Sequence, residues 1–340
     1  MTSTTTSGSR TRAGIRSALT RRAADLAPVG ALVLLMIVFT IADRQFLTWG
    51  NFKGVFDQSA VPLVLGVGMT YVILLGAIDL SVEGILVASS LAVALLVADK
   101  TNSVDIGMFP ALVVGILIGV AMGFVNGFIN TRFKIPSFMV TLGMWSVGLG
   151  IGQILFGNVP PRIENEVRAW GSYGNNPFRW FGVTRLFYLA LAVVFVGFLI
   201  QRWTRLGRYA YAIGGNEELA KQSGINIARY KTFVFMFAGG AFGLAGGMLL
   251  TRTGVGDLRA AQGFLFLTIA GVVIGGTLLM GGRGGVLHSS VGIFIMVVLN
   301  NGMVVLGVSQ FWQDAVAGFI VVAAVVITGL ASRRRMRVVP

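Results

Sequence analysis

Long apolar stretches alternate with short polar segments along most of the chain. Stretches such as 31–41 and 187–200 show no alternation of polar and apolar positions, so they predict helices rather than strands. A helix needs about 20 apolar residues to cross a hydrocarbon core about 30 Å thick. The pattern therefore predicts an all-α integral membrane protein with about ten transmembrane helices in one bundle. They are expected at about 26–44, 57–77, 83–98, 109–130, 136–157, 182–201, 230–251, 262–281, 286–306 and 312–331.

The overall composition agrees with a chain that is surrounded mainly by lipid. Hydrophobic residues make up 55% of the chain and charged residues only 12%, with a mean hydropathy of +0.81, which is far from the values of soluble domains. The 47 glycines fit helices that approach one another closely within a membrane. Because there is no cysteine, a disulfide framework and a thiolate metal site are both excluded.

The positive charges indicate how the helices are oriented. A formal net charge of +14 would suggest a nucleic-acid partner in a soluble chain. In a membrane protein, the positions of the basic residues relative to the apolar stretches instead indicate which segments face the cytoplasm. With the N-terminus in the cytoplasm, 18 of the 27 Lys and Arg residues fall in cytoplasmic segments. This bias predicts cytoplasmic termini, a disordered basic tail at 1–25, a basic tail at 332–340 and no nucleic-acid partner. A cleaved signal peptide is not favoured, because Arg44 and Gln45 stand where small residues would be needed.

Three connections stand out between the predicted helices. Asp79 and Glu83 interrupt the second and third stretches, which are either two helices, one broken helix or a re-entrant segment. The external connection at about 158–181 is rich in Pro, Gly and aromatic residues. The cytoplasmic connection at about 202–229 contains a short polar helix, with Asn216 as its N-cap and Gly224 as its C-terminal stop.

The chain carries no visible source of energy and no catalytic constellation. A phosphate-binding loop of the G-x-x-x-x-G-K-[ST] type is absent, and 281–285 lacks both its lysine and its hydroxyl. An ion relay would need carboxylates or histidines within the helices, but His288 is the sole histidine and is more readily explained as a structural residue. We therefore expect a non-enzyme with no metal site and no cofactor of its own, so that any ATP is hydrolysed on another chain.

Several stretches together resemble the permease subunits of the ribose/xylose/arabinose-type bacterial ABC sugar importer family, within the branched-chain amino acid/sugar permease superfamily. The resemblance covers about 50–330, and the order and spacing of its short motifs make it specific where each motif alone is weak. The motifs are Gly76-Ala77-Ile78-Asp79-Leu80-Ser81-Val82, Asn126-Gly127, Ile135-Pro136-Ser137-Phe138-Met139-Val140-Thr141-Leu142-Gly143, Gly207-Arg208-Tyr209-Ala210-Tyr211-Ala212-Ile213-Gly214-Gly215-Asn216, Ser223-Gly224-Ile225, Ala270-Gly271-Val272-Val273-Ile274-Gly275-Gly276-Thr277 and Gly281-Gly282-Arg283-Gly284-Gly285.

The resemblance implies a multi-pass permease domain at 26–331 in the bacterial cytoplasmic membrane. Its implied partners are a second permease subunit, identical or different, a cytoplasmic ATP-binding subunit, an external solute-binding protein and membrane lipid. The segment 218–224 looks like the loop with which importers dock on their ATPase, although an ordinary amphipathic surface helix is the alternative. The expected coupling residues are Glu217, Glu218, Ala220, Ser223, Gly224 and Ile225.

The chain departs from the family pattern at two places. Relatives usually carry Glu-Leu-Asp-Ala-Ile before the Ala270 motif, whereas 265–269 here reads Leu-Phe-Leu-Thr-Ile, so both carboxylates are missing. Gly84 also follows Glu83 where a simple Ser-Val-Gly is common, which indicates one inserted or substituted residue. The role of the missing acids, at the external mouth or in a subunit contact, is therefore in doubt, and the cargo cannot be copied from one relative.

Polar residues within or near the helices are the candidates for the substrate pathway. Their amides could bind sugar hydroxyls, but hydrogen bonds between helices are an equal alternative, and Asp79 and Ser81 also suit a helix cap. Trp145 and Trp312 could stack on a sugar, although interfacial belts and core filling are commoner roles. The candidate pathway residues are Asp79, Ser81, Asn126, Asn130, Gln153, Asn300 and Asn301.

The function expected from these observations is ATP-driven import of a monosaccharide or related polyol by alternating access. Two alternatives stay open. One is an ABC permease for a non-sugar cargo, such as a nucleoside or a sugar-derived signal molecule. The other is a self-sufficient channel or secondary carrier, which would need an energy source within the chain that the sequence does not show.

Overall fold

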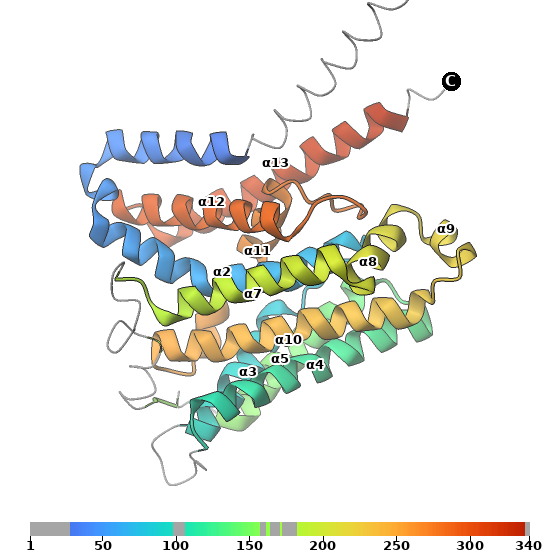
Figure 1. Ribbon diagram of the computed structural model, residues 1–340. Helices are drawn as coiled ribbons and strands as arrows, with labels where there is room; N and C mark the ends of the chain where they lie inside the picture. The colour runs from blue at the N-terminus through green and yellow to red at the C-terminus, as the bar shows by residue number, and fades with distance from the viewer. Residues whose placement is uncertain (1–27, 98–105, 157–160, 164–170, 172–181, 337–340) are drawn as a thin grey trace, which may run out of the picture.

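The computed structural model describes residues 28–97, 106–156, 161–163, 171 and 182–336. Most of the predicted external connection, the predicted tail at 1–25 and residues 337–340 lie outside this part. The described residues fold mainly into helices (Figure 1). One isolated antiparallel bridge pairs Arg162 with Val255. The elements are a first helix Pro28–Ala42, η1 Arg44–Leu47, α2 Trp49–Leu74, α3 Val82–Val97, α4 Met108–Phe133, α5 Ser137–Phe156, α7 Arg185–Trp203, α8 Arg205–Gly215, α9 Glu217–Gln222, α10 Ile227–Thr253, η3 Leu258–Ala261, α11 Phe264–Ile274, α12 Val286–Val305 and α13 Gln310–Met336.

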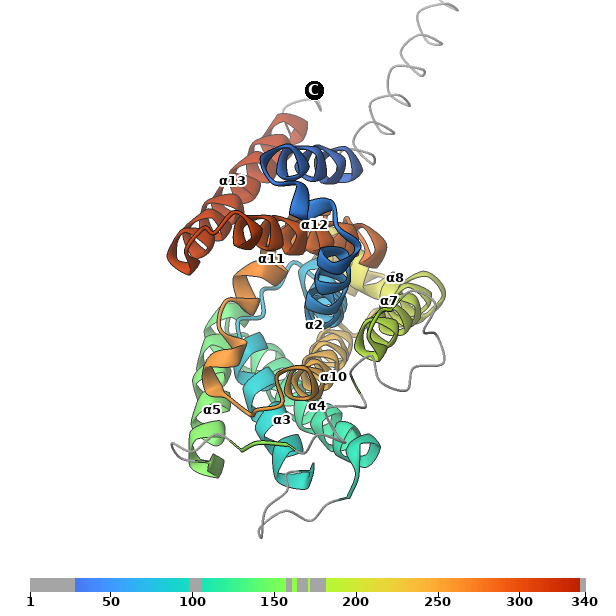
Figure 2. The same cartoon turned by 90° about the vertical axis from the view of Figure 1, so that its left-hand side faces the viewer.

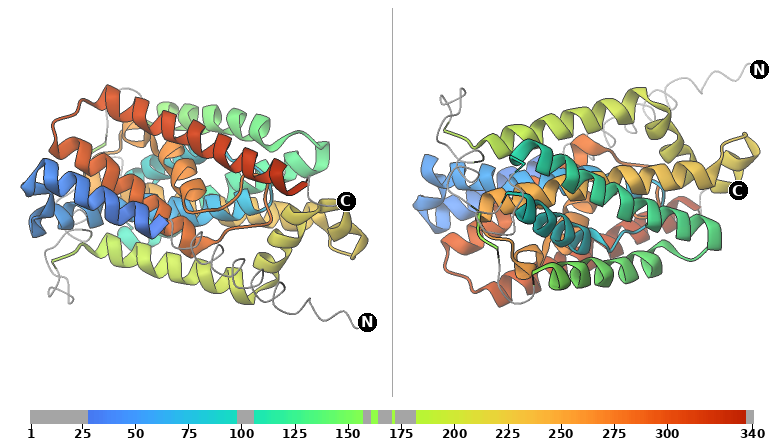
Figure 3. Two further views of the ribbon diagram at one scale, coloured as in Figure 1. Left: turned by 90° about the horizontal axis from the view of Figure 1, so that it is seen from above. Right: turned by 90° about the horizontal axis from the view of Figure 1, so that it is seen from below.

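The helix α2 is the centre of the bundle. Its residues from Ser59 to Leu74 are buried, and it packs against α10, α12, α7 and α11. Figure 2 shows α3, α4, α5 and α10 grouped on one side of α2, and α11, α12, α13 and the first helix on the other. The long helices run roughly along one direction, and α8 and α9 extend at one end, which we call the α9 end (Figure 3). The C-terminal end of α13 points toward the α9 end (Figure 1).

Helix is found at each of the ten predicted positions, with shifted limits. Within the described part of the chain, six helices are long and apolar enough to span a membrane: α2, α4, α5, α7, α10 and α12. The prediction of an integral membrane helical protein thus agrees with the fold, while ten spans and cytoplasmic termini stay predictions. The segment expected at about 202–229 is mostly helical, because α7 continues to Trp203, α8 follows at once and α10 begins at Ile227.

Two limits differ most from the predicted ones: α2 begins at Trp49 and not at about 57, and α11 ends early. A helix was expected to about residue 281, but α11 ends at Ile274. Gly276 has φ +95°, and its backbone nitrogen donates to Val273 while Thr277 donates to Val272. The helix α2 ends in the same way, with Gly76 at φ +73°. This left-handed stop explains why a continuous apolar stretch does not form one continuous helix.

The turns that follow α2 and α11 meet in the interior. The backbone nitrogen of Gly282 donates a hydrogen bond of 2.9 Å to the carbonyl oxygen of Leu74. A Cβ atom on Gly281 would lie 2.6 Å from the nitrogen of Gly76, so the two turns touch backbone to backbone. The run between the second and third predicted helices is therefore two helices, α2 and α3, joined by the turn 75–81, in which Leu75, Asp79 and Ser81 are buried.

Glycines also bring pairs of long helices into direct backbone contact. A Cβ on Gly119 of α4 would lie 2.0 Å from the carbonyl oxygen of Gly239 on α10. A Cβ on Gly148 of α5 would lie 2.3 Å from the carbonyl oxygen of Gly84 on α3. These contacts are those expected of small residues at helix interfaces in lipid. The second one places α5 beside the start of α3.

Candidate functional site

The predicted coupling segment forms α9, a helix of 6 residues with a clear start and stop. The side-chain oxygen of Asn216 accepts a hydrogen bond of 3.0 Å from the nitrogen of Leu219, so the predicted N-cap is confirmed. Gly224 has φ +81°, its nitrogen donates to Lys221 and that of Ile225 donates to Ala220. This is the Schellman pattern, which confirms Gly224 as the stop. The helix is therefore defined by its own sequence.

The expected coupling residues lie on different faces of α9. Ala220 is buried and Ile225 packs against the core, which holds the helix against the bundle. Glu217 forms an ion pair of 2.7 Å with Lys231 of α10. The exposed residues of this segment are Glu217, Glu218, Leu219, Lys221, Gln222, Ser223 and Gly224. Together they present a small, mostly polar surface at the α9 end.

The helix α8 joins α9 to the turn that follows α11. The Tyr211 hydroxyl donates to the carbonyl oxygen of Gly284 at 2.6 Å and is bonded to the Gln201 amide nitrogen. The amide oxygen of Gln201 in turn accepts from the nitrogen of Val286 at 2.9 Å, at the start of α12. Burial raises the pKa of the Tyr211 phenol above its ordinary value, so the hydroxyl stays protonated as a donor. Hydrogen bonds therefore connect α8 to the start of α12.

The same helix also contacts the end of α2. A Cβ on Gly214 would lie 1.8 Å from the carbonyl oxygen of Leu74 and 2.7 Å from the nitrogen of Gly282. The backbones of α8, of the turn after α2 and of the turn after α11 thus meet at one point. This contact connects the α9 end with the interior of the bundle.

Three of the predicted pathway residues form a buried hydrogen-bonded cluster. The carboxylate oxygen Oδ1 of Asp79 accepts from both the nitrogen and the hydroxyl of Ser81, and that hydroxyl accepts from the Asn126 amide at 2.9 Å. All three side chains are buried, and Asp79 Oδ2 and Asn126 Oδ1 have no partner among the described residues. The cluster ties the turn before α3 to α4. In this arrangement the cluster holds two parts of the bundle together, and its buried side chains are not accessible to a solute.

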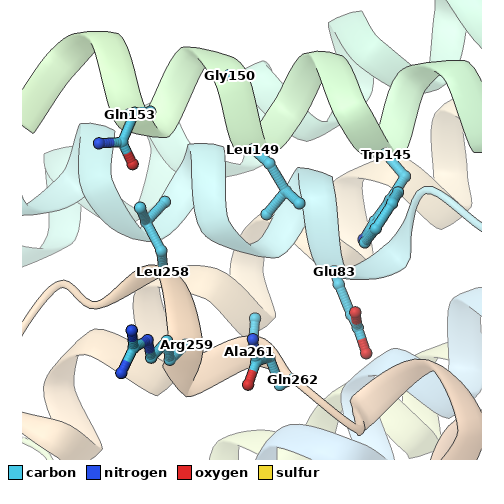
Figure 4. A pocket seen from close by; sticks show the side chains of 9 residues that line it. All are labelled: Glu83, Trp145, Leu149, Gly150, Gln153, Leu258, Arg259, Ala261 and Gln262. Atoms are coloured by element: carbon cyan, nitrogen blue, oxygen red, sulfur yellow. The ribbon is translucent and has the colours of Figure 1, made fainter. Parts of the chain in front are cut away.

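A cavity of about 370 Å³ lies between α3, α5 and η3 (Figure 4). Trp145 and Gln153 reach it from α5, which places them about 12 Å apart along the helix at about 1.5 Å per residue. Glu83 enters from the first turn of α3, and Arg259 and Gln262 enter from η3 and the residue after it. Among the described residues, the indole Nε1 of Trp145 is buried without a hydrogen-bond partner. Charged, amide and aromatic groups thus surround one open space.

The other predicted pathway residues lie elsewhere. Asn130 lines a cavity of about 670 Å³ at the α9 end, together with Glu217 and Lys221. Asn300 lines a cavity of about 330 Å³ that shares Gln262 with the first cavity. The side-chain oxygen of Asn301 accepts a hydrogen bond of 2.9 Å from Asn51. The seven predicted residues therefore do not form one site, and only Gln153 lies in the cavity of Figure 4.

Two residues of this cavity were not singled out from the sequence. Arg259 and Gln262 precede a long apolar stretch, where polar residues usually mark the end of a helix. The signal that could have identified them is the polar spacing of Asp257, Arg259 and Gln262 directly before α11. Glu83 was noted for interrupting an apolar stretch, and Trp145 only as a possible stacking residue.

The described residues offer no metal site of the usual kind. Nowhere in this part of the chain do three His, Asp or Glu side chains come together. His288 is exposed at the first turn of α12. The expectation that the chain binds no metal or cofactor stays a prediction.

Comparison with known proteins identifies the family. Residues 51–325 match the family described as branched-chain amino acid transport system / permease component. The probable ABC transporter permease protein YphD of Escherichia coli is 34% identical, over 94% of each chain. The ribose import permease protein RbsC of Bacillus subtilis is 35% identical over 89% of this chain and 92% of its own length.

The L-arabinose transport system permease protein AraH of Escherichia coli is 31% identical, over 87% of this chain and 89% of its own. No solved structure gave a significant match. The matched region includes every helix from α2 to α12. The chain therefore belongs to the permease-component family of ABC transporters, in its ribose-, arabinose- and allose-type branch, and is a multi-pass protein of the bacterial cytoplasmic membrane.

Proposed function

We propose that this chain is the membrane-spanning subunit of an ABC importer that carries a monosaccharide or related polyol into the cell. Support for a sugar cargo comes from relatives named for ribose, allose and arabinose transport, which cover most of the chain. The importer would contain a second permease, identical or different, a cytoplasmic ATP-binding subunit and an external solute-binding protein. ATP would be used by the ATP-binding subunit, and this chain would act as a passage without catalysis.

The observation that carries the proposal is the connection of α9 to the interior. The helix has its own cap and stop, an exposed face and a buried Ala220, which suits a docking element. Through Tyr211 and Gly214 it reaches the turns that follow α11 and α2. ATP-driven movement of the docked subunit would shift these turns and switch the bundle between outward-open and inward-open states.

The proposed topology has ten spans with both termini in the cytoplasm. It is supported by the bias of basic residues and by the C-terminal end of α13, which points toward the α9 end (Figure 1). In this topology α9 faces the cytoplasm, where an ATP-binding subunit can reach it. The first helix, α3, α11 and α13 would complete the membrane crossings alongside the six long apolar helices.

The test is to replace Gly224 in the reconstituted importer. Gly224→Val forces a β-branched residue into the left-handed region, at a strain of about 1–2 kcal/mol or more. We expect uptake per ATP hydrolysed to fall by about tenfold, since about 1.4 kcal/mol corresponds to a factor of ten. Membrane insertion should be unchanged, because a Cβ at this position has no atom within 4 Å.

The matched control is Gly224→Asn, because Asn tolerates this conformation. It should keep at least half of the uptake. Uptake should be measured with D-ribose, D-allose and L-arabinose in proteoliposomes that contain all subunits. Normal transport by Gly224→Val would contradict the docking role of α9, and uptake by the permease alone would contradict the dependence on an ATP-binding partner.

A further inference from the structure

The cavity between α3, α5 and η3 combines features that a lipid-facing surface does not have. Glu83 and Arg259 bring opposite charges to it, and Gln153 and Gln262 bring two amides. Charged and amide groups in a membrane are costly unless they face the bundle interior or a water-filled space. We therefore expect water and not lipid chains in this cavity.

Close backbone packing fixes the position of Trp145 on the wall of the cavity. A Cβ on Gly84 would lie 2.5 Å from the carbonyl oxygen of Trp145, so α3 and α5 touch at this level. Figure 4 shows the indole reaching from α5 toward the side of Glu83. The ring supplies an apolar face, and its buried Nε1 is a donor that has no partner among the described residues. An unmet buried donor beside an open space calls for a ligand or water with an acceptor oxygen.

The polar groups around the indole match the surface of a sugar. Oε1 of Glu83 accepts a hydrogen bond of 3.1 Å from the nitrogen of Leu265, which holds the carboxylate in place and leaves Oε2 for a hydroxyl donor. Arg259 supplies donors only, and the two amides supply both donors and acceptors. A monosaccharide has hydroxyls of both kinds around an apolar ring face. A cavity of about 370 Å³ also falls in the size range of small-molecule sites.

We propose that this cavity is a station of the translocation pathway where a monosaccharide is contacted directly, with its ring against Trp145 and its hydroxyls on Glu83, Gln153, Arg259 and Gln262. This inference rests on the proposed import of a sugar. It assigns to the permease itself a part in recognising cargo, beyond what the external binding protein contributes. Because the cavity is not fully enclosed, the sugar can leave it and continue along the pathway.

The absence of cysteine allows a direct test of access by water and sugar. Gln153→Cys and Arg259→Cys are introduced separately into the complete importer and exposed to a water-soluble, membrane-impermeant methanethiosulfonate reagent. We expect modification at least about tenfold faster than for Ile154→Cys, because Ile154 is the next residue on α5, is 84% exposed and does not line the cavity. Saturating D-ribose should slow the reaction at Gln153 and leave Ile154 unchanged. Equal rates at Gln153 and Ile154, or no protection by a sugar that the importer carries, would overturn the proposal.

Transport measurements give an independent readout. Trp145→Ala and Gln153→Leu should each lower D-ribose uptake by about fivefold or more, while Trp145→Phe, which keeps an aromatic face, should keep at least half. The matched control is Ile154→Ala, which should keep wild-type uptake and ATP hydrolysis, because Ile154 is exposed and does not line the cavity. Wild-type uptake by both Trp145→Ala and Gln153→Leu would also overturn the proposal.

Failure of this inference can be told apart from failure of the proposed function. If the wild-type importer carries D-ribose, D-allose or L-arabinose but the variants behave as wild type, the cavity is not the station and the sugar import stands. If the wild-type importer carries none of the three sugars, the proposed cargo is wrong, and so is the proposal that the cavity contacts a sugar. Labelling at Gln153 would then still report whether the cavity holds water.

Discussion

The carboxylate oxygen Oε1 of Glu83 accepts a hydrogen bond of 3.1 Å from the backbone nitrogen of Leu265. These two residues belong to the two places where the sequence departs from the family pattern, one at the start of α3 and one at the start of α11. A negative charge is stabilised at the N-terminal turn of a helix, where backbone nitrogens lack partners within the helix. The chain that lacks acids within 265–269 thus receives a carboxylate at this turn from α3.

Removing the Glu83 carboxylate should therefore weaken the contact between α3 and α11. For Glu83→Ala we expect a loss of about 1–3 kcal/mol in the free energy of unfolding, the range for a hydrogen bond to a charged group. Glu83→Gln keeps an acceptor oxygen and should lose less than half of that amount. The measurement is denaturant unfolding of the purified chain in mixed micelles. An unchanged free energy of unfolding in Glu83→Ala would show that the hydrogen bond to Leu265 does not stabilise the contact between α3 and α11.

The long helices could be predicted from the sequence because each contains an apolar stretch with few charged residues. The stop and cap of α9 could be predicted as well, since Asn216 and Gly224 act through their own local conformations. The end of α11 could not, because apolar residues continue beyond Ile274 and only the left-handed conformation of Gly276 ends the helix.

The cavity could not be predicted from the sequence either, for a different reason. It depends on contacts between α3, α5 and η3, which are far apart in the chain. The crossing of α3 and α5 at Gly84 and Gly148 brings Glu83 close to Trp145. Polar residues such as Asn126 and Gln153 look alike in sequence, yet the first is buried in a hydrogen-bonded cluster and the second lines an open space.

The contact between α4 and α10 should be intolerant of any side chain at its centre. Gly119→Ala would place a methyl group 2.0 Å from the carbonyl oxygen of Gly239, where backbone on both sides leaves no room. We expect a loss of about 1–3 kcal/mol in the free energy of unfolding. The control is Gly143→Ala on α5, where a Cβ has no atom within 4 Å. Melting curves of both variants in detergent check the prediction, and equal melting temperatures would refute it.

The buried cluster around Ser81 should behave as one unit. Asp79→Ala leaves the hydroxyl and nitrogen of Ser81 without their acceptor, and Asn126→Ala removes a donor to the same hydroxyl. Each change should cost about 1–3 kcal/mol. The double variant should differ from the sum by at least about 0.5 kcal/mol, because both residues share Ser81.

A control pair for this cycle is Asp79→Ala with Asn301→Ala. Asn301 bonds to Asn51 near the start of α2, whereas Asp79 follows the opposite end of that helix. Their effects on the free energy of unfolding should add within about 0.5 kcal/mol. Additive behaviour in the first pair as well would mean that Ser81 does not link Asp79 to Asn126.

The contact of α8 with the end of α2 should be the most sensitive step in coupling. Gly214→Ala would bring a methyl group 1.8 Å from the carbonyl oxygen of Leu74, so α8 must move away from α2. Gly215→Ala is the matched control, because a Cβ on this neighbouring glycine has no atom within 4 Å. In the complete importer, Gly214→Ala should keep ATP hydrolysis but lower sugar uptake by about tenfold, whereas Gly215→Ala should match the wild type.

A second variant separates the backbone contact from the hydrogen bonds of α8. Tyr211→Phe removes the donor to Gly284 and the bond to Gln201 without adding volume. We expect a smaller loss of uptake per ATP, about threefold, corresponding to less than 1 kcal/mol. If Tyr211→Phe lost more coupling than Gly214→Ala, movement would pass mainly through the turn after α11 and not through the end of α2. Wild-type coupling in both variants would mean that α8 does not transmit movement from α9, and the ATP-binding subunit would have to act through another contact at the α9 end.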